Sequence, residues 1–323
     1  MRYPGEWETH VLTIMGWPCR TELWGPTLEQ ARRDYAYVAN SIADFEPVTM
    51  IASSAQEARQ ARAACAGRVS IVELPMDDSW LRDSGPIYVV DRSGRHAVHF
   101  GFNAWGEKFS PWDKDAEIGG LIARELGDDV RRAPMVLEGG SVISDGAGTL
   151  LTTEQCLLAG NRNPSLGAGA IEELLTEYLG GERIVWLGRG LIEDRDTDGH
   201  VDLIAAFTPD RRVLMQTVPG SNPNFSRCEE NLERVAEADI EVIPIPFLPY
   251  AEVAGERVAV SYLNLYICNG AAIVPVTETD FDDEAMAIIG DAFPGRSVVP
   301  VPGATIAYGG GGPHCITQQV PAV

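Results

Sequence analysis

The chain has 323 residues, of which 45% are apolar and 22% charged, and its formal net charge at pH 7 is -22. This well-mixed composition is typical of a globular protein and excludes a disordered chain, a coiled coil and a membrane-spanning protein. The acidic excess argues against a nucleic-acid-binding protein, and it agrees either with simple solubility or with a small cationic substrate.

Helices and strands alternate in the first quarter of the chain. Apolar side chains recur every three or four residues from Leu28 to Phe45, after a segment with capping-box spacing that begins at Thr27, so we predict an amphipathic helix. The run 48–52 predicts a buried strand, the alanine-rich segment 56–65 a helix, and the run 69–74 a second strand.

Helical patterns then recur at a steady interval of 54 to 58 residues, beginning near Gln56, Asp113, Ala168, Ser226 and Asp280. Ser226 also begins a second capping-box pattern. The interval favours a repeated unit of short strands and one helix in a radial or solenoid fold, because a doubly wound sheet would repeat faster. The alternative is a coincidence in a generic α/β protein.

Two turn signals separate predicted strands. Asp145-Gly146 is typical of a hairpin turn, and Pro209-Asp210 is expected to join strand 201–207 to strand 213–218. No linker interrupts the chain, so we expect one catalytic domain over residues 1–323. Six scattered cysteines predict neither a disulfide framework nor a zinc knuckle, and the start lacks a signal-peptide core, so a cytoplasmic protein is expected.

Four residues capable of chemistry stand in glycine-containing segments at intervals that match the repeat. Asp83 and Glu138 are 55 residues apart, Glu138 and His200 are 62 apart, and His200 and Cys315 are 115 apart, about twice the repeat. Equivalent places in a closed radial fold meet near its axis, so these side chains are expected to converge. Each one alone also has a structural explanation, such as a surface ion pair, a turn cap or a buried thiol.

These residue types favour attack by a thiolate on a cation. Cys315 follows four glycines, which let the backbone approach a ligand closely. Carboxylates near a thiol raise its pKa, which is unfavourable for attack on a neutral carbonyl, whereas a planar guanidinium held by paired carboxylates removes that objection. His200 has no second histidine at metal-ligand spacing, so we expect neither a metal nor another cofactor.

Ordered motifs extend over most of the chain. They are WLRDSGP at 80–86, FNAWG at 102–106, EGGS at 138–141, NRNP at 161–164, TDGHVD at 197–202, YLNLY at 262–266 and HCITQQ at 314–319. In these motifs the sequence resembles the agmatine deiminase family and the bacterial peptidylarginine deiminases, within the guanidine-modifying pentein superfamily. The resemblance implies a five-bladed pseudosymmetric α/β propeller built from ββαβ-like units. It also implies cofactor-free hydrolysis of a guanidino group to a ureido group and ammonia through a cysteine thiouronium intermediate.

The same resemblance assigns roles to individual residues. It implies that Cys315 is the nucleophile and His200 the general acid and base. Asp83 and Asp202 would bind the guanidinium, and Glu138 would assist orientation and proton transfer.

Further residues are expected to shape the substrate pocket. Trp80 and Trp105 would form its walls, with cation–π attraction to the substrate. Gly311 and Gly312 would bring the backbone close to the ligand. Asp198 or Asp196, in the acidic stretch 193–198, would bind an ammonium end, so we predict a preference for agmatine, in a pathway to putrescine and polyamines, over free arginine.

The sequence departs from the usual family pattern at Glu107, Ile143 and Leu203. The substrate is therefore less sharply defined than the reaction, and deimination of arginine, peptidylarginine or another guanidino compound is one alternative. An amidinotransferase is a second, and an inactive binding propeller is a third that the presence of Cys315 and His200 disfavours. Neither nucleic acid nor membrane is an expected partner, and a homodimer agrees with the family.

Overall fold

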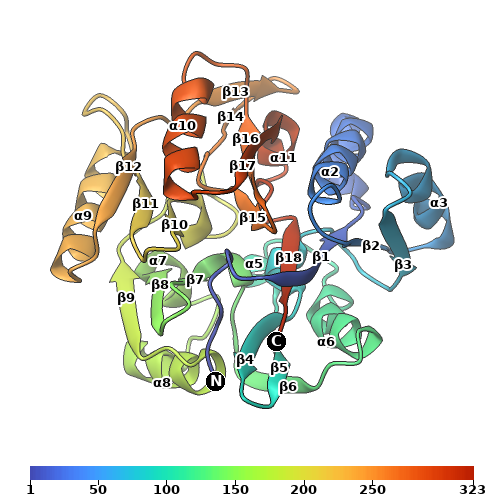
Figure 1. The fold of residues 1–323 in the computed structure, drawn as a ribbon, viewed down its shortest axis with the longest axis horizontal. Coiled ribbons are helices and arrows are strands. Elements are labelled where there is room, and N and C mark those ends of the chain that lie inside the picture. The colour runs from blue at the N-terminus through green and yellow to red at the C-terminus, as the bar shows by residue number, and fades with distance from the viewer.

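The computed structural model describes all residues, Met1–Val323, and arranges their strands in five principal sheets around a central axis (Figure 1). In each sheet an antiparallel strand pair is followed by a strand parallel to the second member of the pair. The longer helices lie on the outside of the ring (Figure 1). This is the five-bladed α/β propeller predicted from the sequence.

The first unit contains strands from both ends of the chain. Strand β18 (Thr317–Pro321) pairs antiparallel with β1 (His10–Gly16), and β1 pairs parallel with β2 (Val48–Ala52) after helix α2 (Leu28–Ile42). An added helix, α3 (Ala55–Ala64), leads to β3 (Val69–Glu73), which pairs with β2. Because the last strand pairs with the first, the ring of units is closed.

The other four units repeat the order strand, strand, helix, strand. They are β4 (Ile87–Asp91), β5 (Gly94–Gly101), α6 (Asp115–Glu125) and β6 (Val130–Val136); β7 (Val142–Ser144), β8 (Thr149–Thr153), α8 (Ala168–Leu179) and β9 (Arg183–Leu187); β10 (Ala205–Phe207), β11 (Val213–Gln216), α9 (Phe225–Glu237) and β12 (Val242–Ile245); and β15 (Tyr266–Cys268), β16 (Ala271–Val276), α10 (Asp282–Ala292) and β17 (Ser297–Pro302).

A separate hairpin and several short helical turns complete the chain. They are β13 (Tyr250–Val253), β14 (Glu256–Ala259), α1 (Thr21–Trp24), η1 (Gly25–Thr27), α4 (Leu81–Ser84), α5 (Ala104–Glu107), η2 (Gly139–Ser141), α7 (Glu154–Leu157), η3 (Val201–Leu203) and α11 (Ala304–Tyr308). None of the helices combines the length and apolar character needed to cross a membrane.

Helix α2 follows the predicted apolar spacing and buries Ala31, Tyr35, Val38 and Ile42. Its predicted capping box is wrong, because the Thr27 hydroxyl donates to a backbone carbonyl and does not cap the helix. The second capping box is also wrong. Helix α9 begins one residue before Ser226, so the serine lies inside the helix and not at its cap.

Helices α6, α8, α9 and α10 begin within two residues of the predicted positions. The helix near Gln56 is not the first member of that series, however, because the crossover between parallel β1 and β2 is α2, and α3 belongs to the added segment. Both predicted hairpins form. The strand expected from Val201 begins only at Ala205, since residues 201–203 form a helical turn at the candidate active site.

Candidate active site

Side chains from two separate segments of the chain meet around Gly140, which belongs to a third. A β-carbon built on Gly140 would lie 2.6 Å from His200 Nδ1, 2.8 Å from Asp202 Oδ2 and 2.9 Å from Asp83 Oδ1. These three side chains are buried. Asp83 and His200, two of the four residues expected to converge, therefore meet here with Asp202, and a glycine at the centre leaves room for them.

The thiol of Cys315 lies in the same cluster. Its Sγ atom is 3.4 Å from Asp202 Oδ2, and its backbone nitrogen donates to Asn264 Oδ1 at 3.3 Å. Burial, together with the charges of Asp202 and Asp83, raises the pKa of the Cys315 thiol well above its ordinary value. The protein thus holds a protonated thiol next to carboxylates.

Two glycines before Cys315 pass closer to other groups than a side chain would allow. A β-carbon on Gly311 would lie 2.8 Å from Cys315 Sγ and 2.9 Å from the ring of Trp80. A β-carbon on Gly312 would lie 2.7 Å from Asn264 Oδ1. The loop therefore packs its backbone directly against the Cys315 thiol and the Asn264 amide.

Asp83, in α4, accepts hydrogen bonds from two directions. The indole nitrogen of Trp105 donates to Oδ2 at 2.8 Å, and the backbone nitrogen of Gly140 donates to Oδ1 at 2.9 Å. His200 Nδ1 lies 3.8 Å from Oδ1. Burial and the nearby charges of Asp202 and Glu138 raise the pKa of Asp83, although His200 opposes the shift.

Trp105 reaches Asp83 from an unusual backbone conformation. Its φ and ψ angles are 56° and 41°, a left-handed region that large side chains rarely adopt. The side chain of Asn103 stabilises this turn by accepting a hydrogen bond from Gly106 N at 2.9 Å. Strain of this kind is often found where a side chain must be aimed at a functional site.

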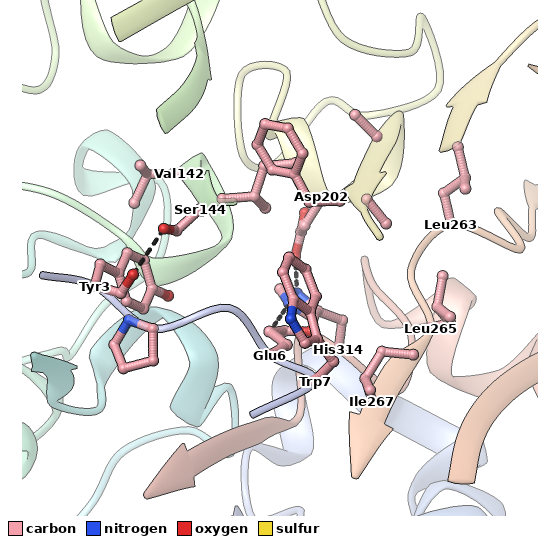
Figure 2. Close-up of a pocket in the computed structure, with 15 residues that line it drawn as sticks. Tyr3, Glu6, Trp7, Val142, Ser144, Asp202, Leu263, Leu265, Ile267 and His314 are labelled. Carbon is pink, nitrogen blue, oxygen red and sulfur yellow. Dashed lines mark hydrogen bonds and ion pairs between the residues drawn. The ribbon is translucent and has the colours of Figure 1, made fainter. Parts of the chain in front are cut away.

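Asp202 is held from behind by an ion-pair chain (Figure 2). His314 Nδ1 lies 2.8 Å from Asp202 Oδ2, and His314 Nε2 lies 2.6 Å from Glu6 Oε1. Arg82 Nη2 lies 3.0 Å from the same glutamate oxygen and donates through Nε to the carbonyl of His314 at 3.2 Å. Glu6, from the segment before β1, thus anchors His314, the residue next to Cys315.

This chain of charges sets the protonation of its members. Burial and Arg82 would lower the pKa of His314, but the carboxylates of Glu6 and Asp202 raise it. Burial would raise the pKa of Asp202, but His314, His200 and Arg82 hold it below its ordinary value. Likewise, the pKa of Glu6 falls to about 2 despite burial, because of His314 and Arg82. Asp202 is therefore kept ionised in a buried position.

Glu138 and Asp198 share one buried arginine. Glu138 Oε1 accepts from Arg162 Nε at 2.5 Å, and Asp198 Oδ2 accepts from Arg162 Nη1 at 2.9 Å. Asp198 also binds Lys108 Nζ at 2.7 Å and Asn161 Nδ2 at 3.1 Å. Both carboxylate oxygens of Asp198 are therefore occupied within the protein.

A small pocket opens onto the thiol. Trp80, Asp83, Trp105, Asp196 and Cys315 are among the residues that line it, whereas Asp198 is not. The ring of Trp80 stacks on the ring of Trp24, with their centroids 5.8 Å apart, and this contact holds Trp80 in place. The carboxylate of Asp196 makes no hydrogen bond or ion pair, and burial with the charge of a neighbouring acid raises its pKa.

Sequence reasoning did not find the buried partners of these residues. Arg162 and His314 lie in the motifs at 161–164 and 314–319, but the motifs do not indicate the ion-pair partners of these two residues. Glu6 carries no motif signal at all. Cys156, in α7, is one of six cysteines scattered along the sequence. In the structure its sulfur, an oxygen of Glu138 and a ring nitrogen of His200 lie within 4.8 Å of one another. These three residues therefore form a cluster that could hold a metal ion.

Comparison with known proteins places the chain in a family. The family of Porphyromonas-type peptidyl-arginine deiminases matches residues 2–321. The chain belongs to this family. One relative, the agmatine deiminase of Stutzerimonas stutzeri, is 41% identical to this chain, and the alignment covers 99% of this chain and 95% of the relative. The agmatine deiminase of Pseudomonas aeruginosa is 40% identical at the same coverage.

Solved structures agree with this assignment to the deiminase family. The agmatine deiminase of Enterococcus faecalis superposes with a TM-score of 0.94 at 31% identity, covering 99% of this chain and 96% of that one. A Cys-to-Ser variant of the C. jejuni agmatine deiminase, described as having substrate bound, superposes with a TM-score of 0.92 at 25% identity and the same coverage.

Proposed function

We propose that this deiminase-family enzyme hydrolyses agmatine, converting its guanidino group to a ureido group and releasing ammonia. The observation that carries the proposal is a buried thiol, Cys315, whose Sγ lies 3.4 Å from one of two converging aspartates. Two carboxylates oppose formation of a thiolate, but a bound guanidinium reverses that effect by supplying positive charge at the same place. Relatives that are named agmatine deiminases support the choice of substrate.

The proposed reaction has two halves. As the cation binds, Cys315 passes its proton to His200 and adds through sulfur to the central guanidinium carbon. The tetrahedral adduct then expels ammonia, which leaves with the proton that His200 returns. The resulting thiouronium is then attacked by water, from which His200 takes a proton. Collapse of the second adduct breaks the carbon–sulfur bond, and it releases the ureido product and the thiol.

The surrounding residues would support these steps. Asp83 and Asp202 bind the guanidinium nitrogens, and Glu138 orients His200 and assists proton transfer. Trp80 and Trp105 form the pocket walls. These steps use only side chains and water, so we propose that no cofactor takes part.

The free carboxylate at the pocket supports agmatine over arginine. Asp196 lines the pocket and has no partner, so it is suited to an ammonium group. Asp198, the other aspartate expected from the sequence to do this, is engaged by Lys108 and Arg162. We therefore propose that Asp196 binds the ammonium end and that Asp198 supports the loop.

A single catalytic domain, a cytoplasmic location and a homodimer remain predictions.

A product assay tests the proposed function. Purified enzyme would be given agmatine, arginine, an arginine-terminated peptide and an amine acceptor, and ureido products, ammonia and amidino-transfer products would be measured separately. We expect ureido product and ammonia with a clear preference for agmatine. Equal kcat/KM for arginine would contradict the proposed specificity, and amidino transfer would identify the alternative class.

The nucleophile is tested in the same assay. Cys315→Ser should abolish turnover without unfolding the protein, and Cys228→Ala, which removes a buried thiol from α9, should retain it. A mass increase on Cys315 in a His200→Ala variant given substrate would mark the covalent intermediate. Near-normal turnover by Cys315→Ser would contradict covalent thiol catalysis.

A further inference from the structure

A second buried thiol lies beside the proposed acid–base pair. Cys156 Sγ, a carboxylate oxygen of Glu138 and a ring nitrogen of His200 lie within 4.8 Å of one another, and all three residues are buried. The Thr153 hydroxyl accepts from Cys156 N at 3.2 Å and donates to the carbonyl of Gly199 at 2.7 Å. Thr153 therefore ties the turn that carries Cys156 to the residue preceding His200.

The polar atoms in this cluster are largely unused. Glu138 Oε2 and both ring nitrogens of His200 are buried and have no hydrogen-bond partner. Buried polar atoms without a partner are uncommon, and each one calls for an explanation. The other oxygen of Glu138 is bound to Arg162, which holds the carboxylate in place and leaves Oε2 free.

We propose that Cys156, His200 and Glu138 bind Zn²⁺ and that the bound ion inhibits the enzyme. Thiolate, imidazole and carboxylate are the three donor types that zinc prefers, and three protein ligands leave a fourth position for water. Magnesium and calcium prefer oxygen donors, so they do not fit this set. When zinc binds, the Cys156 thiol releases its proton to solvent, and the two anionic ligands balance the charge of the ion.

Inhibition follows from the groups that the ion would occupy. Zinc takes a lone pair of His200, which the proposed reaction needs for proton transfer, and it engages Glu138. The positive charge would also oppose binding of a guanidinium at Asp83 and Asp202. Inhibition therefore rests on the proposed function, whereas zinc binding does not.

Cys315 offers a competing metal site, but its neighbours are less available. Both ring nitrogens of His314 are already engaged, one by Asp202 at 2.8 Å and the other by Glu6 at 2.6 Å. An ion held by Cys315 and His314 together would have to break one of these pairs. The cluster around Cys156 requires no such loss.

Activity measurements with zinc chloride form the first part of the test. We expect wild-type enzyme to lose agmatine turnover as zinc is added and to regain it with a chelator. Cys156→Ala should raise the inhibitory zinc concentration by at least about tenfold, which corresponds to about 1.4 kcal/mol of binding free energy. Cys228→Ala is the matched control and should be inhibited like the wild type. Cys156→Ser, whose hydroxyl is a poor zinc ligand of similar size, guards against a packing effect.

Direct binding forms the second part and needs no turnover. Calorimetry with zinc, and the thiolate-to-cobalt absorption band with Co²⁺, would be recorded for Cys315→Ala with and without Cys156→Ala. We expect one zinc equivalent and a thiolate band in Cys315→Ala, and loss of both in the double variant. A thiolate band that survives in the double variant would overturn the site, as would the absence of binding in Cys315→Ala. Failure of agmatine turnover with retained binding would contradict the proposed function alone.

Discussion

At the residue scale, His314 determines how Asp202 is presented to a substrate. The imidazole lies between the carboxylates of Asp202 and Glu6, and it occupies one oxygen of Asp202. The other oxygen, Oδ1, is buried without a partner. His314 is therefore a positioning residue in our proposal, because it acts on the substrate through Asp202.

His314→Gln should weaken substrate binding more than it slows the chemistry. Without the charge of His314, the buried carboxylate of Asp202 loses its ionic partner, so we expect KM for agmatine to rise about tenfold with a smaller change in kcat. Steady-state kinetics would measure the two constants. His10→Gln removes a histidine from another buried His–Glu pair and should leave both nearly unchanged. A lower kcat at constant KM would argue against this role.

The two aspartates at 196 and 198 should respond differently to neutralisation. Asp196→Asn removes the unpaired carboxylate at the pocket, so KM for agmatine should rise about tenfold while kcat changes little. Asp198→Asn instead weakens the contacts with Lys108 and Arg162 and should lower the free energy of unfolding by about 1 to 3 kcal/mol. Kinetics and thermal unfolding of both variants would separate these effects. The assignment is wrong if Asp198→Asn alone raises KM.

At the element scale, the short helical turn η2 is the place where three units of the propeller come together. Its central glycine leaves no space for a methyl group, since His200, Asp202 and Asp83 all lie within 2.9 Å of the ideal β-carbon position. Its backbone nitrogen also donates to Asp83. The turn therefore serves both as a spacer and as a hydrogen-bond donor.

Gly140→Ala should abolish most activity while the protein stays folded. The methyl group must displace the side chains proposed to bind and protonate the substrate, and displacement of catalytic groups by about 1 Å can cost about a hundredfold in rate. Turnover and the far-UV spectrum would be compared with those of Gly160→Ala, whose added methyl group would contact nothing. Wild-type activity in Gly140→Ala would show that the site tolerates more volume than the structure allows.

At the scale of the whole molecule, a buried acidic pair links α6 to the loop that leads into the active site. Asp115 Oδ1 accepts hydrogen bonds from the backbone nitrogens of Asp77 and Asp78 at 2.7 and 3.1 Å. Burial, reinforced by the neighbouring acids, raises the pKa of Asp115 to about 7. Burial also raises the pKa of Asp78 to about 6, against the effect of Arg20.

These shifts predict that stability falls as the pH rises from about 4 to about 7. Over this range the folded state binds more protons at Asp115 than the unfolded chain does, because the unfolded carboxyl has an ordinary pKa. The free energy of unfolding therefore falls with each unit of pH. Asp115→Asn keeps an oxygen acceptor without the charge. It should therefore flatten the pH dependence and stabilise the protein at pH 8 by on the order of 3 kcal/mol.

Unfolding in denaturant across this pH range would check the prediction. Asp44→Asn changes an exposed aspartate and should leave the profile unaltered. If Asp115→Asn showed the wild-type slope, Asp115 would not be the group that titrates.

Local patterns in the sequence predicted much of the fold. The apolar spacing of α2, the strand 48–52 and the turns near Asp145 and Pro209 are recovered, because they depend on neighbours a few residues apart. The capping boxes are wrong because a matching spacing does not determine which hydrogen bond a hydroxyl makes. The first repeat helix was misassigned because the sequence does not reveal that α3 and β3 are an addition to one unit.

The sequence by itself determined the family, the repeat and the residues that meet at the axis, since motifs and intervals are properties of the chain. Only the tertiary structure decided which charges are free. It pairs Asp198 with Lys108 and Arg162 and leaves Asp196 unpaired at the pocket. It also places Glu6 against His314, and Cys156 near His200. The physical reason is that these contacts join residues far apart in the chain, so no local pattern specifies them, and they form only when separate segments of the propeller pack together.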